Sequence, residues 1–204
     1  MALGIQGDLQ TQWQSRYVTE GRDNLPGSSL FSVNAGLSAG VWQAWEEGGP
    51  YRENNLYLEY APLLGDWRPY ANVTYLQFHP DDPDDVEVGA GVSRPLNRIV
   101  SVALDGTWSR RAEGSFYGLS LIAEKALAEP LIASLRVTQT LDHGYASKAY
   151  NGLNNTEAAV ALDWSARDHL DVYAGWQYSW AGEDVRRDGG DDEQWGEIGL
   201  MLYF

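Results

Sequence analysis

The sequence predicts an all-β fold, a closed antiparallel up-and-down barrel of about twelve strands. Three observations predict it. Apolar and polar residues alternate along most of the 204-residue chain, which is the period of a strand with one apolar face. Short and long connectors alternate between these segments. The composition combines 22 Gly, 9 Trp and 12 Tyr with no Cys, which suits strands with aromatic ends and excludes a disulfide framework.

The overall composition limits both the domain organisation and the partners. No linker or shift in composition divides the chain, so we expect one domain over residues 1–204. The net charge of −15 argues against binding nucleic acid, which requires clustered Lys and Arg. No apolar run approaches the roughly 20 residues of a membrane-spanning helix. Strands with one polar face can cross a membrane at low hydropathy, so we expect a transmembrane barrel.

The alternation can be followed from the N-terminus. In the first segment, 9–17, three glutamines and an arginine share one face, while Leu, Trp and Tyr lie on the other. This is strand periodicity rather than helix periodicity. The same two-faced pattern returns in segments 55–60, 86–93, 100–108 and 170–180.

The connectors differ in length in a regular order. Short turns alternating with longer polar loops are typical of barrels in the bacterial outer membrane. The predicted short turns are 61–66, 93–98, 126–130 and 165–168. The predicted long loops are 20–27, 46–54, 79–85, 109–115, 142–155 and 182–193.

Two segments can be interpreted in more than one way. Residues 28–46 are too many for one strand of about 9–11 residues, so we divide them by a tight turn near Asn34-Ala35-Gly36, where Asn and Gly supply positive φ angles. Both termini then lie on one side. Residues 119–135 contain good helix formers before Pro130. A hairpin is preferred here, and a helix is the alternative, because a lone helix fits poorly between regularly spaced strands.

The last segment, QWGEIGLMLYF, resembles the closing strand of a bacterial outer-membrane barrel. Alternate residues of a strand share a face. In that class of protein, the terminal Phe and the alternating apolar residues before it form a signal that the barrel-assembly machinery reads. The resemblance implies an outer-membrane location, with that machinery, membrane lipid and lipopolysaccharide as partners. The predicted assembly signal is Ile198, Leu200, Leu202 and Phe204.

The segment from Ser15 to Asp23, SRYVTEGRD, resembles the opening segment of a family of small bacterial porins with about twelve strands. In that family a Ser-x-Tyr strand runs into a Gly just before the first outer loop. The resemblance implies passive passage of small solutes, and it carries over no catalytic residues.

In a transmembrane barrel the polar faces point inward. Acids outnumber arginines on these faces, so an open pore should prefer cations or neutral molecules. The alternative is that Arg and Glu pair across the interior and plug it, since about eight strands leave room only for side chains and about sixteen leave a channel. The predicted pore-lining residues are Gln12, Arg16, Glu59, Arg68, Asn72, Glu87, Asp105, Arg136, Glu157, Asp163, Asp171 and Glu197.

The aromatic residues divide between the two faces. Those on the apolar faces are expected to form girdles at the membrane interfaces. Those on the polar faces could fill the interior or form a carbohydrate track. The outward set is Trp13, Trp45, Trp67, Trp108, Trp164, Trp176 and Trp180, and the inward set is Trp42, Tyr57, Tyr70, Tyr173 and Trp195.

A different class of function is a plugged barrel that acts as an enzyme of the lipase or protease type, or as a structural or partner-binding membrane protein. The best catalytic candidates are Asp142 and His143 with Ser147 nearby, but no motif supports them. The acidic loop segments 81–85 and 188–193 do not match the spacing of a calcium loop. We therefore expect no enzyme, no cofactor and no metal site.

Overall fold

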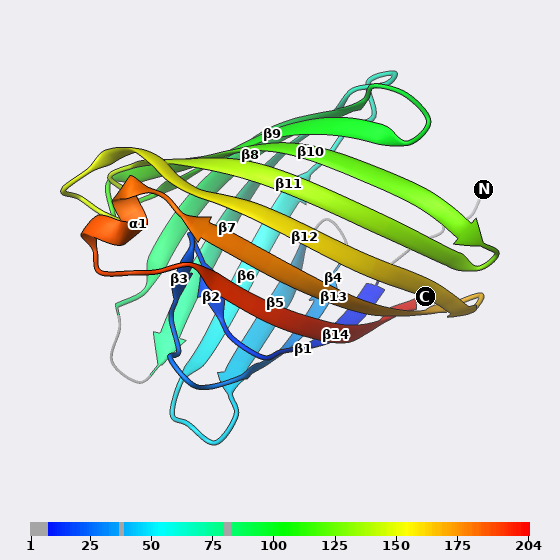
Figure 1. Cartoon of the computed structure of the whole chain (residues 1–204). Helices are drawn as coiled ribbons and strands as arrows, with labels where there is room; N and C mark the ends of the chain where they lie inside the picture. Colours follow the sequence, from blue (N-terminus) through cyan, green and yellow to red (C-terminus); the bar gives the residue numbers. More distant parts are fainter. Residues whose placement is uncertain (1–7, 37–38, 80–82) are drawn as a thin grey trace.

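The computed structural model describes residues 8–36, 39–79 and 83–204. Twelve strands of the described residues close into one antiparallel barrel (Figure 1). This confirms the predicted fold class. The barrel strands are β1 (Asp8–Gln14), β4 (Leu30–Gly36), β5 (Ala39–Glu46), β6 (Arg52–Tyr60), β7 (Arg68–His79), β8 (Asp85–Pro95), β9 (Val100–Ser109), β10 (Gly114–Ala128), β11 (Leu131–His143), β12 (Asn151–Arg167), β13 (Leu170–Ala181) and β14 (Glu193–Tyr203).

The barrel closes through its first strand. β1 pairs antiparallel with β14 on one side and with β4 on the other, so that Gln14 lies opposite Glu197 and also opposite Leu30. Every other barrel strand pairs with its sequence neighbours. Closure leaves no strand edge with unpaired backbone groups, which a lipid environment would penalise.

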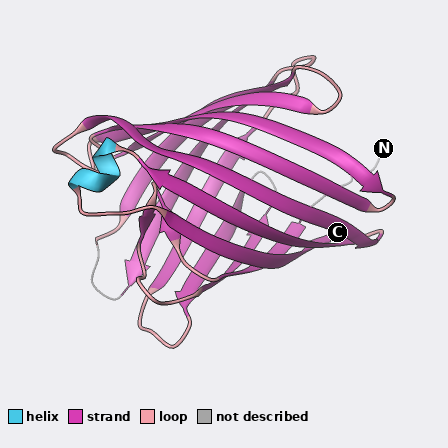
Figure 2. Cartoon of the chain, viewed as in Figure 1, coloured by secondary structure: helices cyan, strands magenta, loops and turns pink. Residues whose placement is uncertain are grey.

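The two ends of the barrel differ. The short turns lie at the same end as the C-terminus and the start of β1, and we call this the turn side (Figure 1). The longer loops lie at the other end, the loop side. There, β2 (Val18–Thr19) and β3 (Arg22–Asp23) form a small hairpin, and a short helix, α1 (Glu183–Arg187), precedes β14 (Figure 2). Among the described residues, no helix has the length and apolar character needed to cross a membrane.

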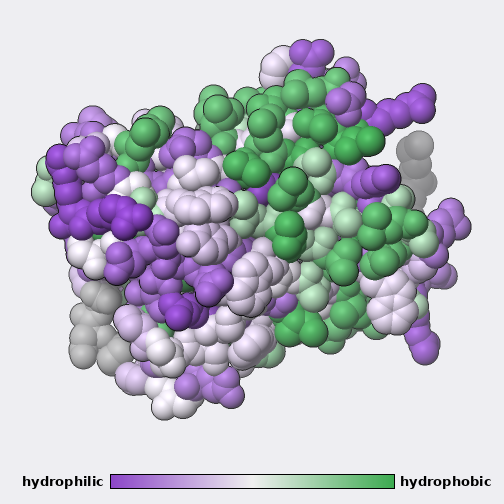
Figure 3. Space-filling view, viewed as in Figure 1, coloured by the Kyte–Doolittle hydropathy of each residue, from purple (hydrophilic) through white to green (hydrophobic). Residues whose placement is uncertain are grey.

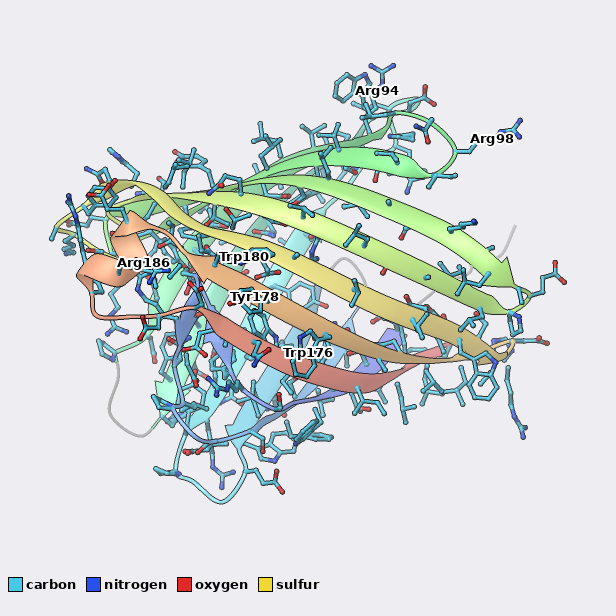
Figure 4. The ribbon with its side chains drawn as sticks, in the orientation of Figure 1. Arg94, Arg98, Trp176, Tyr178, Trp180 and Arg186 are labelled. Atoms are coloured by element: carbon cyan, nitrogen blue, oxygen red, sulfur yellow. The ribbon has the colours of Figure 1, made fainter. Side chains whose placement is uncertain are left out.

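The outward faces of the strands are apolar. Large hydrophobic side chains alternate along them, and they form a broad band toward the turn side in Figure 3. The seven tryptophans predicted to face outward are all 38–50% exposed. On β13 the alternate residues Trp176, Tyr178 and Trp180 follow one another from the middle of the strand toward the loop side (Figure 4). The two-faced pattern of the sequence thus corresponds to the two faces of the wall.

The division of residues 28–46 into two strands is confirmed. β4 and β5 pair as a hairpin whose last described pair is Gly36 with Gly40. The turn lies slightly later than predicted, because Asn34, Ala35 and Gly36 remain paired with both β1 and β5. The residues between the strands, 37–38, lie outside the described residues.

The helix considered for residues 119–135 is wrong, and the hairpin is confirmed: β10 and β11 pair from Phe116 to Ala128, with Pro130 in the turn. Several strand boundaries also differ from the prediction. β1 ends at Gln14, before the end of the predicted segment 9–17. β6 begins at Arg52, inside the predicted loop 46–54. β12 begins at Asn151, also inside a predicted loop, because ladder pairing with β11 continues past an irregularity near Leu141.

Candidate functional site

Three cavities lie inside the barrel. The outer cavity, at the loop side, has a volume of about 770 Å³ and is lined by residues that include Tyr17, Glu53 and Glu87. The middle cavity, about 280 Å³, is lined by Asp105 and Arg136 among others. The inner cavity, about 370 Å³, also includes Arg136 and lies toward the turn side. The described interior therefore contains water-sized space at several depths, although twelve strands make a narrow barrel.

Glutamines and one glutamate form a polar wall on β1, β13 and β14. Glu197 accepts hydrogen bonds from Gln12 at 2.6 Å, from Gln177 at 2.8 Å and from Gln14 at 3.4 Å. The donors come from β1 and β13, the two strands that flank β14, because inward residues share a face across the ladder. Gln12 and Glu197, both predicted to line the pore, are thus in contact.

Tyrosines hold two of the other predicted acids. Tyr70 donates a hydrogen bond to Asp105 at 2.8 Å, which joins β7 to β9. Tyr145, in the loop between β11 and β12, donates to Glu87 on β8. This loop therefore reaches over the barrel interior to a strand that is not adjacent in the sheet.

The predicted arginines do not pair across the interior in the described structure. Arg136 lies 3.6 Å from Glu157 on the adjacent strand β12. Arg16 lies beyond the end of β1, where it pairs with Glu193 and sits 3.7 Å from Asp23. The ion pairs follow the wall, so they do not form the plug that was considered from the sequence.

The remaining predicted residues lie along the same inward faces. Asp171 accepts a hydrogen bond from Tyr203 at 3.0 Å, and Asp163 lines the inner cavity. Three others, Glu59, Arg68 and Asn72, lie on β6 and β7, with Arg68 exposed at the turn side. Whether the twelve residues line an open pore stays a prediction.

Sequence reasoning missed the most enclosed carboxylate of the outer cavity. Glu53 is 3% exposed and accepts hydrogen bonds from Tyr17 at 2.8 Å, Tyr51 at 2.6 Å and Asn55 at 2.8 Å. It was assigned to a loop because β6 was expected to start later. Its two-residue spacing from Asn55 was the available signal, since the pair continues the inward face of β6.

A second missed feature holds the loops together at the outer end. Arg22 of β3 lies 2.7 Å from Asp188 and 3.3 Å from Asp184, and it donates a hydrogen bond to Asn154 at 2.8 Å. Asp184 is fully buried. We call this group, together with Asp142, the loop clamp. It joins the first loop, α1 and β12, which are remote in sequence.

Burial and the neighbouring Asp142 raise the pKa of Asp184 to about 6. Asp142 accepts hydrogen bonds from the backbone N–H groups of Tyr145 and Ser147 at 2.7 and 2.8 Å. Asp184 therefore keeps its proton to a higher pH than a free aspartic acid does. Nearby, burial also raises the pKa of Glu20.

The structure gives the candidate catalytic residues other roles. Asp142 accepts backbone hydrogen bonds, and the Ser147 hydroxyl donates to Asp188 at 3.4 Å. In the described structure His143 makes no hydrogen bond with either of them, and its side chain is exposed. A nucleophile requires a base within hydrogen-bond reach, so these residues do not form a triad. Among the described residues, no group of three or more His, Asp or Glu could hold a metal ion.

Comparison with known proteins relates the barrel to solved structures. No protein-family model matches the chain, and no curated protein matches its sequence. The chain superimposes on the NanC porin with a TM-score of 0.62 at 11% identity, covering 96% of this chain and 98% of that one. It superimposes on the KdgM porin with a TM-score of 0.62 at 9% identity, covering 98% and 99%. KdgM has also been solved in complex with disordered oligogalacturonate, with a TM-score of 0.60.

The chain has the fold of the small outer-membrane porins. The match runs over nearly the full length of both chains. At this level of identity the likeness concerns the fold alone. The porin fold confirms the architecture implied by the opening and closing segments. The proposed assembly signal lies outward on it, with Ile198, Leu200, Leu202 and Phe204 44–74% exposed.

Proposed function

We propose that the protein is a bacterial outer-membrane channel through which small solutes diffuse passively, with cations or neutral molecules preferred over anions. The observation that carries the proposal is the acid-lined interior space. Cavities occupy the outer, middle and inner parts of the barrel. A cleft lined by one sign of charge concentrates ions of the opposite sign.

The balance of interior charges supports the preference for cations. The inward faces of the strands carry more acidic side chains than basic ones, and Arg68 and Arg136 are the arginines among the predicted pore-lining residues on the strands. Hydrogen bonds from phenols and amides hold four of the acids, Glu53, Glu87, Asp105 and Glu197, without cancelling their charge. The interior acids include Glu53, Glu59, Asp85, Glu87, Asp105, Glu124, Glu157, Asp163, Asp171 and Glu197.

The same charges argue against an anionic sugar as the preferred solute. One structural neighbour was solved with oligogalacturonate, a chain of carboxylated sugars. Entry of such a chain into an acid-rich interior would be opposed by like-charge repulsion. Such a chain is therefore disfavoured as a solute of this protein.

Planar-bilayer recording tests the proposal. The protein should give stepwise currents, and in a KCl gradient the reversal potential should show preference for K⁺. Asp105→Lys, in the middle cavity, should shift the reversal potential toward anion preference. Asp66→Lys, in an exposed turn, is the matched control and should shift it little. An anion-selective wild-type channel would contradict the proposal.

A second candidate is a plugged barrel with a structural or partner-binding role. The loop clamp favours it, because Arg22, Asp184 and Asn154 pack the loops together at the outer end. Absence of current from protein that is correctly folded in bilayers would support this candidate. The outward aromatic residues fit contact with membrane lipid and lipopolysaccharide in either case.

A further inference from the structure

The residues that line the outer cavity have a composition that the channel proposal does not explain. Its volume of about 770 Å³ lies within the range of roughly 300–1,000 Å³ that binds small molecules in proteins. The first loop, the residue before β6 and β6 itself supply one part of the lining, with Tyr17, Tyr51 and Glu53. Glu87 of β8 and the inward-reaching Tyr145 supply another part. The cavity is thus assembled from segments that only the closed barrel brings together.

The walls carry aromatic surface as well as charge. The rings of Tyr17 and Tyr51 lie 5.9 Å apart, and the ring of Tyr145 lies 5.7 Å from that of Phe116. Phe78 adds a further ring to the lining. Aromatic faces attract ammonium and guanidinium groups, and more strongly where water is excluded. Aromatic rings offer no comparable ligand to a hydrated divalent metal ion.

The charge of the lining is negative. Four carboxylates line the cavity, against the basic residues Arg111 and Lys148. Two of the four are held by phenols, which are neutral donors: Tyr17 and Tyr51 bond to Glu53, and Tyr145 bonds to Glu87. The negative charge of the lining therefore exceeds the positive charge and attracts a cation. The other two carboxylates are Glu20 and Asp85.

The carboxylates are too dispersed for a bound metal. A calcium ion takes about six to eight oxygen ligands at one point, whereas no group of three acidic or histidine side chains among the described residues is close enough to hold a metal. Separated carboxylates between aromatic walls suit a larger ligand that combines positive charge with an apolar body.

We propose that the outer cavity is a binding site for organic cations, compounds that carry ammonium or guanidinium groups on a short apolar chain. The proposal rests on the channel function and names its preferred class of solute. Bound ligand would lie in the cavity within reach of both Glu53 and Glu87. Its charged groups would face the carboxylates, and its methylene groups would contact the rings of Tyr17, Phe78 and Tyr145.

Titration calorimetry on the full chain in detergent tests the site without requiring an open channel. Agmatine, which carries an amine and a guanidinium group, should bind saturably, and binding should weaken with added salt. Glucose and glutamate should not bind. Glu87→Gln should weaken agmatine binding about tenfold, the size expected for losing a charged hydrogen-bond partner.

Asp171→Asn is the matched control. Asp171 is also a strand carboxylate bonded to a tyrosine, Tyr203, but it lies at the turn side, outside the outer cavity. It should leave agmatine binding unchanged. If Glu87→Gln fails to fold, Tyr145→Leu in the adjacent loop provides a second test and should also weaken binding.

Failure to bind agmatine, equal binding of glucose, or an equal loss in Asp171→Asn would overturn the organic-cation site. So would unchanged binding in both outer-cavity variants. These results differ from failure of the channel proposal, which would appear as anion preference or as absence of ion current. Agmatine binding to a protein that carries no current would support the site and contradict the channel.

Discussion

Two neighbouring residues of β11 test whether the apolar face of the wall is in contact with lipid. Val137 faces outward with 40% of its surface exposed, whereas Thr138 faces inward and lines the middle cavity. Both lie near the middle of the strand, so they share a depth in the membrane. A lysine at each position therefore compares the two environments with little else changed.

The expected loss in the free energy of unfolding differs because only the lysine at position 137 would enter the hydrocarbon of the membrane. Lysine on the lipid face near the bilayer midplane costs about 2–4 kcal/mol. Thr138→Lys loses the hydrogen bond of Thr138 to Ser120 at 2.8 Å, worth about 1 kcal/mol. It also places an ammonium opposite Glu157 in the ladder, which offsets part of that loss. We expect Val137→Lys to be the more destabilising by about 1–3 kcal/mol.

Denaturant unfolding in phospholipid vesicles, followed by tryptophan fluorescence, measures both variants against the wild type. The comparison is valid where the free energy of unfolding depends on denaturant concentration with the same slope in the variants and the wild type. Equal stabilities for the two variants, or a larger loss for Thr138→Lys, would refute the assignment of the apolar face to lipid. A wild-type protein that stays monodisperse in buffer without detergent would refute it as well.

The other predictions concern the loop clamp and assembly. Because the pKa of Asp184 is raised on folding, its stabilising contribution is complete at low pH and is lost as the pH rises through about 6. The protection factors of the amides of 183–187, which correct for the intrinsic pH dependence of hydrogen exchange, should fall there, and Asp184→Asn should abolish that fall. Arg22→Leu leaves Asp184 buried without its cation and should weaken α1 docking by about 3–5 kcal/mol, with exchange rates above those of wild type at pH 7; equal rates would contradict the clamp. Phe204→Ala should slow insertion by the assembly machinery, measured as unfolded precursor over time, whereas Leu96→Ala in an exposed turn should not.

Strand periodicity determined most of the fold because the barrel wall has only two environments. Each residue of a wall strand faces either outward or inward, so the alternation of apolar and polar residues assigns each residue to one face directly. This is why the seven tryptophans that were predicted to face outward are found exposed on the outer face. It is also why Asp105 and Glu197 were correctly assigned to inward faces, where each accepts a hydrogen bond from another strand.

The loop side could not be predicted in the same way. Arg22, Asn154 and Asp184 come from three separate segments, and no local pattern links an arginine in the first loop to an acid in the last. Strand ends were also misjudged where polar residues continue the ladder, as at Asn151 in β12. Glu53 was missed for this reason, and with it the outer cavity.

The excess of acids has a consequence that holds for an open or a plugged barrel. The chain has 29 acidic residues against 14 Lys and Arg, and its large outward side chains are apolar, so much of the excess lies in the interior and the loops. A barrel wall of low polarity screens these charges poorly, and mobile cations must therefore enter the interior to balance them. The channel and the plugged barrel differ in how quickly those cations exchange with solution. The loop clamp lies at the outer end, where exchange would occur, and Arg22 is the basic residue that joins its segments. Loosening the clamp with Arg22→Leu should therefore raise the K⁺ current without changing its preference over Cl⁻, because the acids that set the preference remain in place.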